Sequence, residues 1–242
     1  MLECEKLRLS GPDDRDCFDD HRHSLRHTRG VRRSPPPVRV CPGVDHTGRV
    51  PVLARARARA DSIHRFTTFG CEDLIFAGVA GALTDLEVGS VVLVTRGATH
   101  DYGLLSNGVF TCVPVGDLPL PGIVQPLQDL PRVPAQVEQT FVRLRERMAD
   151  KLTIHLGAVL SGDVFINCQD ARTRLRDLGG DIVDMESTAV LDVARRFGKE
   201  AYIVRTVSDG AGDDSHLSYS EMVSIVAHNS AICVEDLLKI MH

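Results

Sequence analysis

The chain has 242 residues, of which 43% are hydrophobic and 25% charged, and it contains no Trp. This length allows one large domain or two small ones with a substantial core, and the composition excludes a wholly disordered chain. The net charge of −5 hides an asymmetry, because residues 1–66 hold 14 Lys and Arg against 9 Asp and Glu. That basic segment lacks interleaved aromatic residues and any nucleic-acid motif, so we expect no nucleic-acid partner.

The compartment is indicated by the cysteines and by the apolar runs. Seven cysteines stand singly, without a CxxC pair, which favours reduced thiols in the cytoplasm and no metal site. No apolar run approaches the length of a bilayer span, and no signal-peptide pattern opens the chain. We therefore expect a cytoplasmic protein with no membrane partner.

The first seventy residues differ from the rest. His and Arg cluster between His21 and Arg39, three consecutive prolines interrupt that stretch, and Ala54–Ala60 alternates Ala with Arg. Neither stretch has an apolar stripe, although residues 50–66 can form a helix by propensity alone. We interpret residues 1–70 as a divergent or poorly ordered N-terminal segment and residues 71–242 as the folded α/β domain.

Short apolar runs bounded by Gly or Asp follow from Cys71 onward. Such runs are typical of strands that are buried on both faces of a sheet. The predicted strands are Leu74–Val79, Ser90–Thr95, Ile154–Leu160, Ile182–Met185 and Ala201–Val207.

Helical patterns lie between and after these runs. Apolar residues recur at helical spacing from Val137 to Met148, and a second helix is predicted from about Glu186 to Phe197, with Gly198 as its left-handed C-cap. Ser218, with a Glu three residues later, predicts a capping box for a last helix. The alternation predicts a three-layer α/β/α domain with a mixed, largely parallel central sheet.

Polar segments at the ends of the predicted strands carry the candidate chemistry, because open α/β sheets bind ligands at the carboxyl ends of their strands. Glu186 and Asp209 occupy two such ends. Two carboxylates in one cleft suit cleavage of a glycosidic bond: one protonates the leaving group and the other stays ionised beside the positive sugar. The segments are Ser161–Ile166, Asp184–Ala189, Val204–Gly210 and Ser215–Tyr219.

Each of these residues also has a structural interpretation. Glu186 can complement a helix dipole, and Asp209 before Gly210 can be a turn signal. Phe165 can belong to the core. Arg205, inside an apolar strand, needs a partner if it is buried. Composition and spacing alone therefore indicate an α/β enzyme with acidic strand ends and leave the reaction open.

The joint pattern resembles the nucleoside phosphorylase superfamily, and within it the 5′-methylthioadenosine/S-adenosylhomocysteine nucleosidases. The resemblance spans Leu74 to the C-terminus. It rests on the order and spacing of Phe76–Gly81, Ser161–Ile166, Asp184–Glu186, Arg205 with Ser208 and Asp209, and Ser215–Tyr219.

The resemblance implies a role for each catalytic residue. Asp209 would protonate the purine at N7, with Ser208 orienting it. Glu186 would bind the ribose hydroxyls and favour an oxocarbenium-like transition state. Met185 would pack on the sugar, and Arg205 would pair with Glu186 or its neighbourhood.

Further residues of the implied substrate site surround the base and the 5′ group. Phe165 would stack on the base, while the backbone of Val164 and Ile166 would read its edge. Tyr219 stands where the family has an aromatic residue facing the 5′ substituent, which suits an apolar alkylthio group. Asp184 belongs to the same substrate-binding set.

The chain departs from the family pattern in three places. Val79 stands where the nucleosidases carry a Ser near the ribose, and Asp184 replaces a Glu. The opening strand and the Glu that activates water cannot be aligned. Glu3 or Glu5 is the candidate for that base, and we assign it to Glu3.

The resemblance predicts a nucleosidase that takes a small purine nucleoside, works without a cofactor or metal, and forms a homodimer in which Leu118–Ile123 is a candidate contact. A phosphorylase would need an Arg near Ile75–Ala77, which is apolar, so hydrolysis is favoured over phosphorolysis. A non-catalytic nucleoside-binding homologue and a deoxyfutalosine-type nucleosidase remain alternatives.

Overall fold

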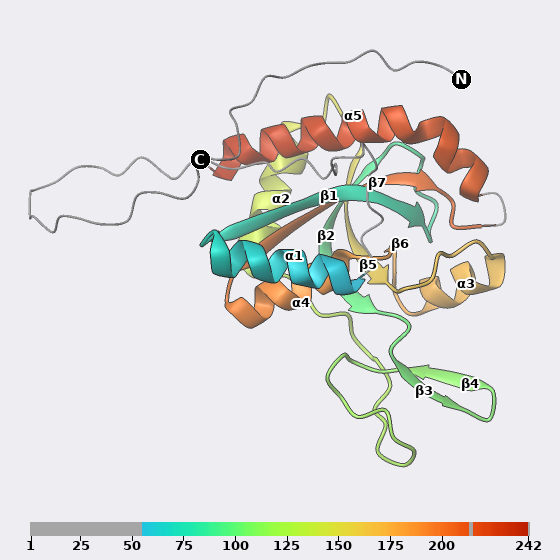
Figure 1. Cartoon of the computed structure of the whole chain (residues 1–242). Coiled ribbons are helices and arrows are strands. Elements are labelled where there is room, and N and C mark those ends of the chain that lie inside the picture. The colour runs from blue at the N-terminus through green and yellow to red at the C-terminus, as the bar shows by residue number, and fades with distance from the viewer. Residues whose placement is uncertain (1–54, 213–214, 242) are drawn as a thin grey trace, which may run out of the picture. The chain divides into compact units, whose positions relative to one another are not determined.

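The computed structural model describes residues 55–212 and 215–241, except for the side chains of residues 215–225, and all of them lie within one compact unit (Figure 1). Helix α1 (Arg55–Thr68) precedes strands β1 (Asp73–Ala82), β2 (Val91–Thr99), β3 (Gly103–Ser106) and β4 (Val109–Cys112). Then come α2 (Ala135–Arg147), β5 (Ile154–Ser161), α3 (Gln169–Asp177), β6 (Ile182–Asp184), α4 (Ser187–Phe197), β7 (Glu200–Asp209) and α5 (Ser215–Met241).

Five strands form the central sheet, which closes on itself in the order β1-β6-β5-β2-β7. The pairs β1–β7, β2–β5 and β5–β6 are parallel, whereas β1–β6 and β2–β7 are antiparallel. The expected α/β fold with a mixed, largely parallel sheet is therefore confirmed. The sheet is a small barrel in this structure, and the three-layer arrangement stays a prediction.

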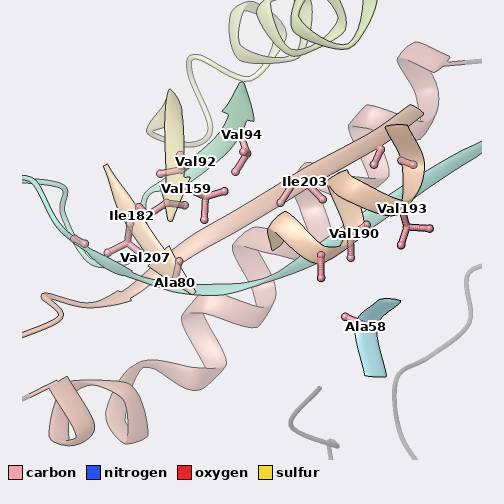
Figure 2. Packing of buried hydrophobic residues seen from close by; sticks show 14 of the residues in the cluster. Ala58, Ala80, Val92, Val94, Val159, Ile182, Val190, Val193, Ile203 and Val207 are labelled. Atoms are coloured by element: carbon pink, nitrogen blue, oxygen red, sulfur yellow. The ribbon is translucent and has the colours of Figure 1, made fainter. Parts of the chain in front are cut away.

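Alternate residues of the strands pack against different helices. Val92 and Val94 belong to a cluster with Ala58 of α1 and Val190 of α4, all nearly inaccessible to solvent (Figure 2). Val91 and Leu93, which alternate with them along β2, pack instead with residues of α2 and α5. Because successive side chains of a strand point to opposite faces, one apolar run supplies both clusters.

The predicted strands are all present, and β1 and β7 extend beyond the predicted ends. Helix α4 ends as predicted, since Gly198 adopts the left-handed conformation with φ 62°. The prediction for the last helix is wrong at its start: α5 begins at Ser215, so Ser218 lies inside the helix and is not its cap. The helix allowed by propensity over residues 50–66 is present as α1 from Arg55 to Thr68, and residues 50–54 lie outside the described part of the chain.

Two features were missed by the sequence prediction. Strands β3 and β4 form a hairpin whose two turn residues, Asn107 and Gly108, have φ of 50° and 78°. An Asn-Gly pair between short apolar runs is the usual signal for such a turn. Helix α3 buries only Leu175, so it has no apolar stripe to reveal it. None of the described helices combines the length and apolar character needed to cross a bilayer.

Candidate active site

The candidate site begins where three strands meet. Gly81 on β1 is the Cα partner of both Val183 on β6 and Asp209 on β7. Glu186 follows the end of β6 by two residues, so the two predicted carboxylates leave strands that flank the same glycine. A Cβ atom at Gly81 would lie 3.0 Å from Asp209 Oδ1, which is tighter than an ordinary contact. The small residue therefore lets β1 pass close to this carboxylate.

Asp209 is held by donors on both of its oxygens. The residue is 4% exposed. The Ser208 hydroxyl donates a hydrogen bond of 2.7 Å to Oδ2, and the Ala211 amide donates one of 2.8 Å to Oδ1. The carboxyl group thus has a fixed orientation at the end of β7, with donors already in place for its ionised form.

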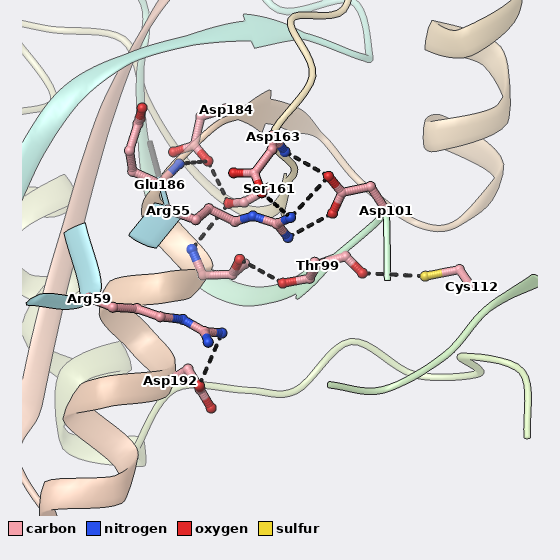
Figure 3. Close-up of polar contacts among 11 residues, drawn as sticks. Arg55, Arg59, Thr99, Asp101, Cys112, Ser161, Asp163, Asp184, Glu186 and Asp192 are labelled. Carbon is pink, nitrogen blue, oxygen red and sulfur yellow. Dashed lines mark hydrogen bonds and ion pairs between the residues drawn. The ribbon is translucent and has the colours of Figure 1, made fainter. Parts of the chain in front are cut away.

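A buried ion pair lies beside this position. Arg205 on β7 directs Nε to Asp184 Oδ2 at 2.7 Å, and the two side chains are 3% and 2% exposed. Asp184 also accepts a hydrogen bond of 2.5 Å from the Ser161 hydroxyl (Figure 3). The Ser187 hydroxyl donates a second one. The amides of Glu186 and Ser187 approach the same carboxylate at 3.2–3.3 Å. Asp184 therefore joins β5, β6, β7 and the start of α4.

The guanidinium of Arg205 is also enclosed on its other sides. Its Cζ lies 4.4 Å from the centre of the Phe76 ring, in a cation–π contact. A Cβ atom at Gly78 would lie 2.1 Å from Nη1, so no other residue fits there without moving the arginine. Nη2 is buried without a hydrogen bond. This unmatched donor faces Glu186, whose Oε2 is 3.8 Å away.

Glu186 is the N-cap residue of α4, but its side chain makes no capping hydrogen bond. Its side chain is only 17% exposed. Burial raises the pKa of Glu186 from 4.5 to about 7; the charge of Arg205 opposes this increase, and that of Asp184 adds to it. The result is a carboxyl group that titrates near neutral pH beside a buried cation, as is common at catalytic sites.

The remaining predicted residues lie on the adjoining segments. Val164 and Phe165 follow β5 and are each 55% exposed, whereas Ile166 is 8% exposed and packs in the core. Val79 on β1 and Met185 after β6 are partly buried. Phe165 is therefore presented to solvent and is not a core residue.

Two predictions fall outside what the structure describes. Tyr219 lies on helix α5, and its side chain is not among the described ones. Glu3 lies outside the described residues altogether. Their roles stay predictions.

Sequence reasoning missed a second polar cluster. Arg55, the first residue of α1, contacts Asp101 after β2 and Asp163 after β5 (Figure 3). It also missed the hydroxyls of Ser161 and Ser187 as partners of Asp184. Arg55 stands in the Ala-Arg alternation, where nothing in the spacing marks one arginine above its neighbours.

Comparison with known proteins gives a family match over most of the chain. The model of the phosphorylase superfamily matches residues 14–239. The chain is 32% identical over 188 residues to the 5′-methylthioadenosine/S-adenosylhomocysteine nucleosidase of Mycobacterium bovis, with 72% of each chain covered. It is 27% identical over 167 residues to the aminodeoxyfutalosine nucleosidase of Helicobacter pylori, with 67% of this chain and 66% of the relative covered.

Solved structures support the fold. A Helicobacter pylori 5′-methylthioadenosine/S-adenosylhomocysteine nucleosidase with a bound inhibitor superposes with a TM-score of 0.65 at 21% identity, covering 77% of this chain and 76% of the other. The Neisseria meningitidis enzyme in complex with methylthio-immucillin-A gives a TM-score of 0.64 at 23% identity, with 77% and 78% covered.

Proposed function

Because the chain belongs to the phosphorylase superfamily, we propose that it is a purine nucleosidase that hydrolyses the N-glycosidic bond of 5′-methylthioadenosine, S-adenosylhomocysteine or a related adenine nucleoside. The observation that carries the proposal is the presence of two differently held carboxyl groups at the ends of β6 and β7, the two strands that flank β1. Asp209 is held by two donors, and Glu186 has its pKa raised to about 7. The relatives at 32% and 27% identity are both nucleosidases.

Asp209 acts as the general acid. The C1′–N9 bond breaks, its electron pair passes to the purine, and the purine takes a proton on N7 from Asp209. The Ser208 hydroxyl and the Ala211 amide already point at the two carboxylate oxygens. They stabilise the negative charge that proton transfer leaves on Asp209, without reorganisation at that moment.

Glu186 binds the sugar in its ionised form. Its carboxylate accepts hydrogen bonds from the ribose hydroxyls and stabilises the positive charge that develops on the sugar. The buried charge of Arg205 favours ionisation, because it is the largest of the contributions that lower the pKa of Glu186. Arg205 and Asp184 together fix the strand ends on which both carboxyl groups stand.

The remaining residues surround the substrate. Phe165 stacks on the base, the backbone of Val164 and Ile166 reads its edge, and Met185 packs on the sugar. Val79 lies near the ribose without a polar group to offer it. Tyr219 faces the 5′ substituent. A water oxygen bonds to C1′ and loses a proton to a base that we assign to Glu3.

The reaction is tested by measuring adenine release from 5′-methylthioadenosine with and without phosphate. We expect release without phosphate and a loss of at least ~100-fold in kcat for Asp209→Asn, which keeps the shape but cannot donate the proton. Strict dependence on phosphate would show a phosphorylase instead. Tight nucleoside binding without turnover would show a non-catalytic homologue, and faster release from aminodeoxyfutalosine would change the assigned substrate.

We further expect a cytoplasmic homodimer. Leu105 and Val109 of the β3–β4 hairpin are 69% and 66% exposed, and Leu118 and Ile123 in the following loop are 66% and 55% exposed. This hairpin projects away from the central strands (Figure 1). Exposed apolar residues gathered on one projection favour contact with a second copy of the chain. Light scattering on the full chain measures the expected dimer mass.

A further inference from the structure

Arg55 connects two carboxylates that belong to different loops. Its Nη1 lies 2.6 Å from Asp101 Oδ1 in an ion pair, and its Nη2 donates a hydrogen bond to Asp101 Oδ2 at 3.0 Å. The same Nη2 donates to Asp163 Oδ2 at 2.7 Å. The amide of Asp163 donates to Asp101 Oδ2 at 2.6 Å, which closes the cluster (Figure 3).

The guanidinium of Arg55 is satisfied by these two partners. Arg55 is the first described residue of α1, and its side chain is 18% exposed. The two carboxylates carry more negative charge than the one guanidinium offsets, so Arg55 is not a free site for phosphate.

The loops joined by Arg55 are anchored at their bases. The amide of His100 donates to Ser161 O at 3.0 Å, and the amide of Gly162 donates to Asp184 O at 3.1 Å. A Cβ atom at Gly162 would lie 2.3 Å from His100 Nε2, so the two segments approach as closely as a glycine permits. Burial lowers the pKa of His100, so its ring is protonated less readily than a free imidazole.

The residues that follow Gly162 are exposed to solvent and accessible to a ligand. Asp163 is followed directly by Val164 and Phe165, each 55% exposed, before the chain returns to the core at Ile166. Between Gly162 and Ile166 the only charged side chain is Asp163, and Arg55 holds it. The contact of Asp163 with Arg55 is therefore the ion pair that ties the segment leading to Phe165 to α1.

We propose that Arg55 is a positioning residue which, through Asp101 and Asp163, fixes the loop 163–166 against α1 and thereby sets the affinity for the purine base. This inference rests on the proposed function. Arg55 touches no reacting atom. Its removal should weaken binding of the base and leave the proton transfer from Asp209 largely intact.

The test compares Arg55→Met with wild type in steady-state kinetics and in calorimetric binding of adenine. We expect KM and the dissociation constant for adenine to rise about tenfold, as for loss of a charge-assisted hydrogen bond, while kcat falls less than about threefold. Arg57→Met is the matched control, because Arg57 lies on the same helix and is exposed. It should leave all three quantities unchanged.

The neighbouring carboxylate provides a second readout. Asp163 has a 55% exposed side chain, so Asp163→Asn should fold even if Arg55→Met does not. It should also raise KM, and the double variant should be no worse than Arg55→Met alone, since Arg55→Met already removes the interaction that Asp163→Asn weakens. Additive effects of the two substitutions would overturn the inference.

The outcomes separate this inference from the proposed function. Wild-type chain that releases no adenine and binds none would overturn the proposed function together with the inference. Active wild type with unchanged KM and adenine affinity in Arg55→Met would overturn the inference alone. A fall in kcat at constant KM would also overturn it, because that result assigns Arg55 to the chemical step.

Discussion

Replacing Glu186 by Gln should stabilise the fold at alkaline pH while it removes activity. The carboxyl of Glu186 lies beside Arg205, and its pKa is raised from 4.5 to about 7, mainly by burial. Its side chain is 17% exposed, so solvent screens little of this effect. The ionised carboxylate therefore costs ~3 kcal/mol more in the folded chain than in the unfolded one.

The direction in which stability changes with pH follows from proton binding to Glu186. Because the folded-state pKa of Glu186 exceeds the unfolded value, the folded chain holds this proton more tightly, and stability falls as pH rises from 4.5 to about 7. Gln cannot ionise, so the variant avoids that loss. At about pH 8 its free energy of unfolding should exceed that of wild type by up to ~3 kcal/mol, a figure that already includes the attraction between Glu186 and Arg205. At about pH 4 the two proteins should be alike.

Urea unfolding at both pH values measures this difference through the midpoint at constant slope. In thermal melts each kcal/mol corresponds to roughly 2–4 °C for a chain of this size. The control is Glu146→Gln, at an exposed position on α2. It should change the free energy of unfolding only slightly, and by the same amount at both pH values. In activity assays, kcat/KM of wild type should rise with pH through about 7 as Glu186 ionises. The reasoning fails if Glu186→Gln is no more stable than wild type at about pH 8.

Two further substitutions probe the buried ion pair. Arg205→Met leaves Asp184 buried without its cation, so we expect a loss of ~3–5 kcal/mol in urea unfolding and an alkaline shift of the pH–rate limb. Unchanged stability would contradict this expectation and show that the hydroxyl and amide donors to Asp184 suffice without the cation. Gly78→Ala places a Cβ atom 2.1 Å from Arg205 Nη1 and should cost ~1–3 kcal/mol. Gly210→Ala is its stability control, since a Cβ atom there meets nothing within 4 Å, and an equal loss in both would contradict the steric argument.

Much of the fold could be predicted because its signals are local. The apolar runs that form β1 and β7 are bounded by Gly or Asp, and the C-cap of α4 needs only Gly198. The predicted start of α5 was wrong because the Ser-x-x-Glu pattern at Ser218 also fits the interior of a helix that begins earlier. The closure of the sheet was beyond reach, since it depends on the antiparallel pairing of β1 with β6 over only two registered pairs.

The residues of the candidate site also divide into those that local sequence signals could predict and those that depend on tertiary contacts. Polar strand ends marked Glu186 and Asp209, because the position of a residue along its own strand is visible in the sequence. The need of Arg205 for a partner was also visible, but the choice of Asp184 depends on how β6 lies against β1 and β7. The contact of Arg55 with Asp163 joins residues 108 apart, and no periodic pattern encodes such a pair.

The geometry around Arg205 explains why Glu186 titrates near neutral pH. An arginine next to a carboxylate ordinarily lowers its pKa. Here Arg205 directs Nε to Asp184 at 2.7 Å and leaves Glu186 at 3.8 Å from Nη2. Asp184 is committed to that contact by the hydroxyls of Ser161 and Ser187. The attraction that remains for Glu186 is smaller than the effect of its burial, so its pKa rises. Asp184 thus adds to the effect of burial on the pKa of Glu186, because it engages the same cation and carries a like charge.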